Sequence, residues 1–154
     1  MQYSEIYNFL GRQAYKLVLP IMRILIRRTE RVYVVIKHDG QVLLAKNWLG
    51  RQDWQLPGGG KRAGETPYQT AVREVKEEVG ISLRREDIKP VKDGRWRTDG
   101  MDFKYSIVSV RLESKPEISL RSWEVIDSLW TPTKKIGELN LAPEIADAIR
   151  SKNT

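Results

Sequence analysis

The sequence contains no cysteine and only one histidine among its 154 residues. Without cysteine the chain has no disulfide, no thiolate metal ligand and no cysteine nucleophile. A single histidine excludes any site that needs two imidazole rings. The lack of cysteine fits a reducing compartment, and we expect a cytoplasmic protein. Internal repeats and low-complexity segments are also missing, so the chain length predicts a single folded domain.

Long hydrophobic runs are lacking as well. The apolar stretch at residues 17–26 is too short to cross a membrane and is interrupted by Pro20 and Arg23. It has neither the basic flank nor the small-residue cleavage site of a secretory signal. Two interpretations stay open: a basic amphipathic segment on a membrane surface, or a helix packed on the domain or on a second copy in a homodimer. Helical spacing favours packing, with residues 1–30 as this segment and residues 31–154 as the domain.

Acidic residues are fewer than basic ones, 20 against 27, which gives the chain a formal net charge of +7. Such an excess favours anionic partners, namely nucleotides, nucleic acid or an acidic membrane surface. Charge alone does not choose among these partners, because a basic surface also serves solubility.

The spacing of apolar residues predicts the secondary structure. Alternation and turn signals predict strands at residues 31–37, 41–47, 54–57, 102–114 and 125–132. Helical periodicity predicts helices at residues 66–79 and 142–152. Strands before and after a glycine-flanked helix are typical of a mixed α/β domain.

The helix expected at residues 66–79 carries three glutamates, Glu74, Glu77 and Glu78, on one face. Their i, i+3 and i+4 spacing brings the side chains together. Like charges at this spacing destabilise a helix by roughly 0.2–0.5 kcal/mol per pair, so the cluster needs a cause. On a charged helix such a group is most often a solvated face. Whether it is instead a functional site depends on the residues that flank it in the sequence.

A glycine-rich turn, residues 58–60, leads toward this helix. Such turns bind phosphates through backbone N–H groups, whereas carboxylates repel phosphates. Both features make sense together if divalent cations lie between them, because Mg²⁺ bridges carboxylates to substrate phosphates. Glu74 and Glu78 lie one turn apart, about 6 Å along the axis, so they can converge on adjacent ions. A phosphate-loop nucleotidase is excluded because no Ser or Thr follows Lys61 and no glycine stands five residues before Gly60.

The stretch "GGGKRAGETPYQTAVREVKEEVGI" resembles the Nudix box, whose pattern is G, five residues, E, seven residues, R-E-aliphatic-x-E-E-x-G-aliphatic. Every fixed position is filled in this chain, by Gly59, Glu65, Arg73, Glu74, Val75, Glu77, Glu78, Gly80 and Ile81. With average residue usage, a chance match has a probability on the order of 10⁻⁷. The resemblance implies an α/β/α sandwich with a mixed sheet. It also implies hydrolysis of a diphosphate bond in a nucleoside derivative, with Mg²⁺ or Mn²⁺ as cofactor.

The resemblance further implies roles for individual residues. The metal ligands would be the carboxylates of Glu74, Glu77 and Glu78 and the backbone carbonyl of Gly58. Arg73 would hold a glutamate in place beside them. Structural support would come from Gly59, Glu65 and Gly80.

The identity of the general base varies within the family that this box resembles. It is Glu74 in some members and a glutamate outside the box in others. Glu124, six residues before Trp130, stands where many relatives carry this extra acidic residue, and Asp127 is the substitute candidate.

Substrate specificity depends on residues outside the box. Basic residues flank the glycine turn and can meet substrate phosphates: Arg51, Lys61 and Arg62. Tryptophans near the expected cleft can stack a base or fill the core: Trp48, Trp54 and Trp96. Three substrate classes stay open, namely nucleoside triphosphates, nucleotide sugars and dinucleotides, and triphosphorylated RNA 5′ ends. A non-catalytic nucleotide-binding module is a further alternative, although such relatives usually lose box glutamates.

Overall fold

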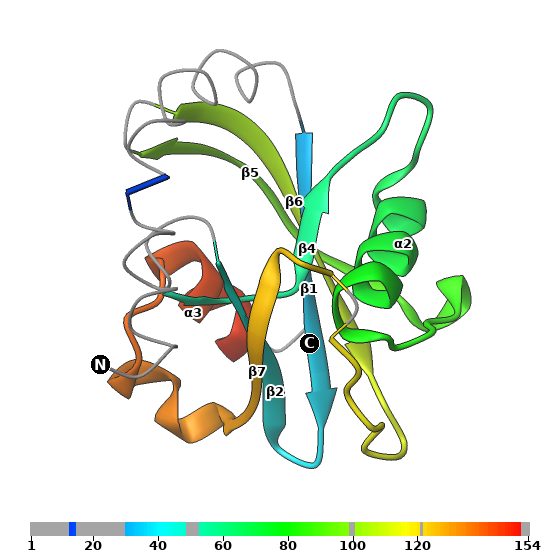
Figure 1. Cartoon of the computed structure of the whole chain (residues 1–154), viewed down its shortest axis with the longest axis vertical. Helices are drawn as coiled ribbons and strands as arrows, with labels where there is room; N and C mark the ends of the chain where they lie inside the picture. The colour runs from blue at the N-terminus through cyan, green and yellow to red at the C-terminus, as the bar shows by residue number, and fades with distance from the viewer. Residues whose placement is uncertain (1–12, 15–29, 49–52, 99–100, 121, 152–154) are drawn as a thin grey trace.

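The computed structural model describes residues 13–14, 30–48, 53–98, 101–120 and 122–151 (Figure 1). The N-terminal segment expected at residues 1–30 lies outside the described residues, apart from residues 13, 14 and 30. Its packing and its part in a homodimer therefore stay predictions. Among the described residues, no helix has the length and apolar character needed to cross a membrane.

Within the described residues, seven strands form one mixed sheet. The strands are β1 Glu30–His38, β2 Gln41–Asn47, β3 Trp54–Gln55, β4 Gly58–Gly60, β5 Lys89–Thr98, β6 Met101–Arg111 and β7 Val125–Pro132. Their order is β3-β2-β1-β6-β5, while β4 pairs with β1 and β7 pairs with β2. β1 and β6 run parallel, and the other pairs are antiparallel.

Helix α2 (Pro67–Val79) and helix α3 (Pro143–Arg150) cover opposite faces of the sheet (Figure 1). The alternation of β1 separates the two cores, because successive side chains of a strand point to opposite faces. Val32, Val34 and Ile36 belong to the core that contains α2. Tyr33 and Val35 belong to the core that contains α3. The layered α/β architecture expected from the sequence is thereby confirmed.

Local sequence signals set both ends of α2. Thr66 is the N-cap and forms a capping box with Gln69, and a proline occupies the first helical position. Gly80 ends the helix with a φ of 77°, in the left-handed region that favours glycine. Val75 and Val79 are fully buried against the sheet. The helix is thus fixed in position, and its opposite, acidic side is presented at the N-terminal end of β1.

Two strands and two short helices were not expected from the sequence. β4 consists entirely of glycine, and β5 contains proline, glycine and several charged residues. Two 3₁₀ helices, Arg85–Asp87 and Thr133–Glu138, connect regular elements in the described chain. The strand expected at residues 102–114 ends at Arg111, and the one expected at 54–57 ends at Gln55.

Candidate active site

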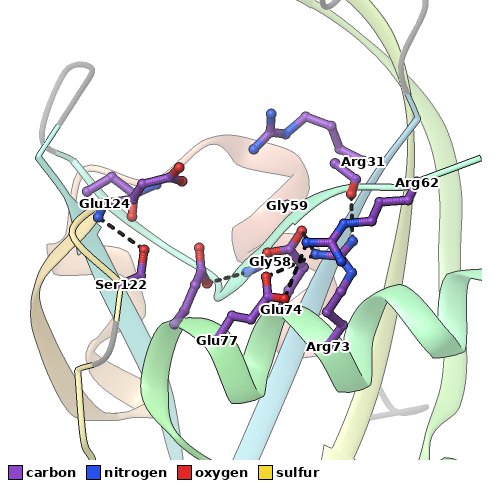
Figure 2. A pocket seen from close by; sticks show the side chains of 12 residues that line it. Arg31, Gly58, Gly59, Arg62, Arg73, Glu74, Glu77, Ser122 and Glu124 are labelled. Carbon is purple, nitrogen blue, oxygen red and sulfur yellow. Dashed lines mark hydrogen bonds and ion pairs between the residues drawn. The ribbon is translucent and has the colours of Figure 1, made fainter.

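A pocket of about 300 Å³ lies between β4, the acidic face of α2 and the segment that precedes β7 (Figure 2). Within the described residues its charged lining consists of Glu74, Glu77, Glu78, Glu124, Arg31, Arg62 and Arg73. The glycine turn, residues 58–60, also lines it, together with Asn47 and Ser122. The fold therefore brings the box residues that were predicted to act together into one pocket.

The glycine turn approaches its neighbours so closely that two of its residues have no room for a side chain. Gly58 has a φ of 147°, and a Cβ there would lie 2.0 Å from the carbonyl oxygen of Val32. A Cβ on Gly59 would lie 2.5 Å from the Glu74 carboxylate. A Cβ on Gly60 would meet nothing within 4 Å. The first two glycines thus allow β4 to pass directly over β1 and α2.

Arg73 organises the acidic face of α2. Its Nε and Nη2 donate to the two carboxylate oxygens of Glu65, at 2.7 and 2.8 Å. Its Nη1 donates to Glu74 at 2.6 Å and to Glu77 at 3.2 Å. Nη2 also donates to the backbone carbonyl of Gly60 at 2.9 Å. One guanidinium thereby offsets the mutual repulsion of these carboxylates and ties α2 to the glycine turn.

The Arg73–Glu65 pair is the strongest coupling in this network. Its two parallel hydrogen bonds form a bidentate contact, which is the favoured geometry between guanidinium and carboxylate. The hydrogen bonds from Arg73 hold the pKa of Glu65 well below its usual range. Hydrogen bonding to Glu65 in turn raises the pKa of Arg73. These contacts fit the supporting roles expected for both residues.

Glu78 is the most buried carboxylate of the pocket, with 5% of its surface exposed. Its Oε2 accepts a hydrogen bond of 2.8 Å from the backbone N–H of Gly58. Burial, together with the negative charges of Glu74 and Glu124, raises the pKa of Glu78 to about 8. The Gly58 hydrogen bond and the positive charge of Arg31 act in the opposite direction. Glu78 is thus held in a place where its ionised form is unfavourable without a further cation.

The structure separates the two candidates for an acidic residue outside the box. Glu124 lines the pocket, and its backbone is held by the hydroxyl of Ser122 and by the N–H of Trp48. Asp127 lies on β7, does not line the pocket and accepts a hydrogen bond from the N–H of Ser128. Only Glu124 of these two is brought to the site.

The basic residues expected to bind substrate have different surroundings. Arg62 lines the pocket, and its Nη2 lies 3.3 Å from Glu77. Lys61 does not line the pocket and forms an ion pair with Glu30. Arg51 lies outside the described residues. Their roles in substrate binding remain predictions.

Arg31 lines the pocket but was not expected from the sequence. It opens an apolar strand, where a basic residue is most simply read as a solvated strand end. Only the pairing of Arg31 with Gly60 of β4 places it beside the glycine turn. The missing information was therefore the β1–β4 pairing, which no local pattern of three glycines reveals.

The chemistry of the donor set fits a divalent cation. Carboxylate oxygens are the ligands that Mg²⁺ and Mn²⁺ prefer, and the buried Glu78 carboxylate lies among like charges. Among the described residues, no three acidic or histidine side chains are already gathered as a metal site. Glu74 and Glu77 are bonded to Arg73, and Glu78 to Gly58. Binding of a cation would therefore require at least one of these side chains to turn.

Comparison with known proteins places this chain in a family. The NUDIX domain model matches residues 27–151, so the chain belongs to the Nudix family. The family predicted from the box is thereby confirmed, and its α/β fold agrees with the structure.

The relatives by sequence carry a more specific name. An RNA pyrophosphohydrolase of Vibrio atlanticus is 40% identical over 84 residues, which cover 54% of this chain and 45% of that protein. An RNA pyrophosphohydrolase of Pseudoalteromonas translucida is 45% identical over 62 residues, covering 40% and 34%. The chain thus spans less than half the length of these curated relatives.

Solved structures agree with the fold. A MutT NUDIX hydrolase from Burkholderia pseudomallei has a TM-score of 0.70 at 20% identity, covering 80% of this chain and 97% of that one. The dihydroneopterin triphosphate pyrophosphohydrolase of E. coli has a TM-score of 0.66 at 22% identity, covering 80% and 94%. At such identities the likeness concerns the fold alone.

Proposed function

We propose that this protein is a pyrophosphohydrolase that cleaves a phosphoanhydride bond in a nucleoside diphosphate-linked substrate, with Mg²⁺ or Mn²⁺ as cofactor. The substrate would be a nucleoside triphosphate, a nucleotide sugar or a dinucleotide. The observation that carries the proposal is the contact between Glu78 and the Gly58 N–H at 2.8 Å. It joins the acidic face of α2, which suits a cation, to the glycine turn, which suits a phosphate, within one pocket.

The box residues would hold the cation and keep the pocket in shape. Glu74, Glu77, Glu78 and the Gly58 carbonyl would be its ligands, and Arg73 and Glu65 would fix the helix against the turn. When bound, the cation would neutralise phosphate charge and lower the pKa of a water molecule. The side chains of the protein would then bind the substrate, orient it and accept a proton.

Glu124 is the general base that the surroundings favour. Its carboxylate makes no hydrogen bond or ion pair with the described residues, whereas the Glu74 carboxylate accepts a short bond from Arg73. A carboxylate free of such partners is available to take a proton from water. Glu124 also approaches the pocket from the segment before β7, opposite α2 (Figure 2).

A substrate panel with Mg²⁺ or Mn²⁺ tests the proposed function. We expect release of phosphate, pyrophosphate or a nucleoside monophosphate from at least one compound of the proposed classes. Glu124→Gln tests the base, because it removes the proton acceptor and keeps the size of the side chain; kcat should fall by about 10²-fold or more. Metal binding without turnover of any compound would instead support the non-catalytic nucleotide-binding module.

RNA with a triphosphorylated 5′ end is the second candidate substrate. Relatives named RNA pyrophosphohydrolase are about 40% identical over roughly half of this chain, and its net charge of +7 suits a polyanion. If RNA is the substrate, its apparent affinity should fall steeply with salt through counterion release. A flat salt response together with good turnover of mononucleotides would exclude it.

A further inference from the structure

Arg31 differs from the other cations of the pocket because no carboxylate of the described residues lies within ion-pair distance of it, although its charge acts on Glu78 from farther away. Arg73 is bonded to three glutamates, and Arg62 lies 3.3 Å from Glu77. Arg31 makes no ion pair or side-chain hydrogen bond with the described residues, although its side chain is partly buried. No described residue therefore occupies the five N–H donors of the Arg31 guanidinium, which can bind a ligand.

The position of Arg31 in the sheet directs it to the other side of the glycine turn from α2. It shares a face of β1 with Tyr33, which packs in the core of α3. Figure 2 shows its side chain on one side of β4 and the side chains of Glu74 and Glu77 on the other. The side chain extends toward the space between the glycine turn and Glu124 (Figure 2). A substrate that enters this space would therefore meet the glutamates on one side and Arg31 on the other.

We propose that Arg31 binds a phosphoryl group of the substrate, an inference that rests on the proposed hydrolase function. A diphosphate carries two adjacent anionic groups, and the carboxylates would hold the cation that binds the reacting group. The neighbouring group needs a donor that does not already hold a glutamate. A guanidinium suits it because its planar fork makes two parallel hydrogen bonds to phosphate oxygens.

A purely structural role for Arg31 is the competing explanation. Its charge opposes that of Glu78, so it could serve only to stabilise the acidic cluster. In that case Arg31→Gln should lower the stability of the metal-free protein and affect kcat as much as KM. A phosphate-binding role instead predicts a rise in KM that exceeds any change in kcat.

Steady-state kinetics of three variants on the best substrate separate these explanations. Arg31→Gln removes the charge and keeps a polar stem, and KM should rise about tenfold or more, with kcat within about threefold of wild type. Arg31→Lys restores the charge without the fork, so its KM should lie between those of Arg31→Gln and wild type.

Lys104→Gln is the matched control. Lys104 is exposed on β6, next to β1, in register with Glu30 and on the sheet face opposite Arg31. Its replacement changes the net charge by the same amount, so its KM should stay within about twofold of wild type. An equal rise in KM for Lys104→Gln and Arg31→Gln would mean that only the overall charge matters, and would overturn the assignment.

Direct binding of methylenediphosphonate with Mg²⁺, measured by titration calorimetry, tests Arg31 without requiring turnover. We expect the Kd to be about tenfold higher for Arg31→Gln than for wild type and Lys104→Gln. Equal affinities, or no binding to wild type, would overturn the role of Arg31. Failure of the whole substrate panel would overturn the proposed hydrolase function, and the calorimetric comparison would still decide whether Arg31 binds a diphosphate.

Discussion

Replacing Glu78 with Gln should stabilise the metal-free protein at alkaline pH and destroy its activity. Glu78 is buried in the pocket and accepts a hydrogen bond from the Gly58 N–H, which the amide oxygen of Gln can also accept. The charged form of Glu78 is unfavourable because of burial and because Glu74 and Glu124 are nearby. Gln keeps the shape and removes this charge.

The sign of the pH dependence follows from the raised pKa. Below pH 4.5 the Glu78 carboxyl is protonated in both the folded and the unfolded chain, so it contributes nothing to the pH dependence. Between pH 4.5 and about 8 the folded chain binds the proton more tightly, and stability falls as pH rises. Above about pH 8 the carboxylate is ionised in both states, and the full penalty remains.

The size of the effect follows from the size of the shift. A rise in pKa from 4.5 to about 8 corresponds to roughly 4–5 kcal/mol above pH 8 and roughly 3 kcal/mol at pH 7. If the new NH₂ group of Gln finds no hydrogen-bond acceptor, the free energy of unfolding would fall by about 1–3 kcal/mol at every pH. Because this cost does not depend on pH, the change in ΔΔG between pH 5 and pH 9 isolates the charge, and it should be roughly 3–4 kcal/mol.

Urea denaturation in EDTA at pH 5, 7 and 9 measures this change. Glu77→Gln is the control, because it removes the same charge from an exposed position of the same helix, where solvent screens it. A constant difference between wild type and Glu78→Gln across this range would refute the reasoning. Added Mg²⁺ should stabilise wild type more than Glu78→Gln if Glu78 is a ligand, and kcat should fall by orders of magnitude.

Two further predictions concern the support of the site. Glu65→Gln should lower both the melting temperature at neutral pH and kcat, because Arg73 loses its ionised partner. The difference in melting temperature between wild type and Glu65→Gln should shrink as pH falls below 4.5, because the pKa of Glu65 is depressed in the folded protein. Replacing each residue of the glycine turn with alanine should give three different results, measured as the free energy of unfolding in urea and as kcat. Gly58→Ala should lower the free energy of unfolding by more than about 3 kcal/mol, because its Cβ would clash with the Val32 carbonyl. Gly59→Ala should mainly lower kcat by displacing Glu74. Gly60→Ala should change the free energy of unfolding by less than about 0.5 kcal/mol. Similar losses at all three positions would contradict the geometry of the turn.

Helix α2 was predictable from the sequence because its signals are local. The cap at Thr66, the proline after it and Gly80 at the end determine the bounds through contacts a few residues apart. The helical spacing of its valines predicts which face is buried, and Val75 and Val79 are fully buried. The three glutamates then had to lie on the remaining face, whatever the rest of the fold.

β4 and β5 could not be predicted because their strand character comes from their partners. β4 is three glycines, which have no strand preference, and it pairs with β1 because glycine allows the close approach. β5 contains Pro90 and Gly94, which usually argue against a strand, yet it pairs with β6 along its length. A Cβ on Gly94 would lie 2.5 Å from the Tyr105 ring, so here the glycine makes room for packing across the strands.

The candidate site divides in the same way between local and distant information. The fixed spacing of the box placed Arg73 beside Glu74 and Glu77, and each of these contacts lies within one helical turn. The place of Arg31 beside the glycine turn required the pairing of β1 with β4. That it forms no ion pair with the described residues depends on where every neighbouring carboxylate lies. Sequence patterns identify residues of the right chemistry, whereas the availability of a side chain is a property of the whole fold.

Some hydrogen bonds of Arg73 go to groups that are not predicted metal ligands, and these can hold the site rigid while Glu74 and Glu77 bind a cation. Glu65 and the Gly60 carbonyl together receive three of the hydrogen bonds from Arg73, and neither is a predicted side-chain ligand of a metal. Glu74 and Glu77 can therefore turn away from Arg73 toward a bound cation while the guanidinium keeps its place. The Gly58 N–H fixes Glu78 in the same manner from the other end of the turn. The backbone of the glycine turn thus helps to position α2 through its hydrogen bonds with Arg73 and Glu78.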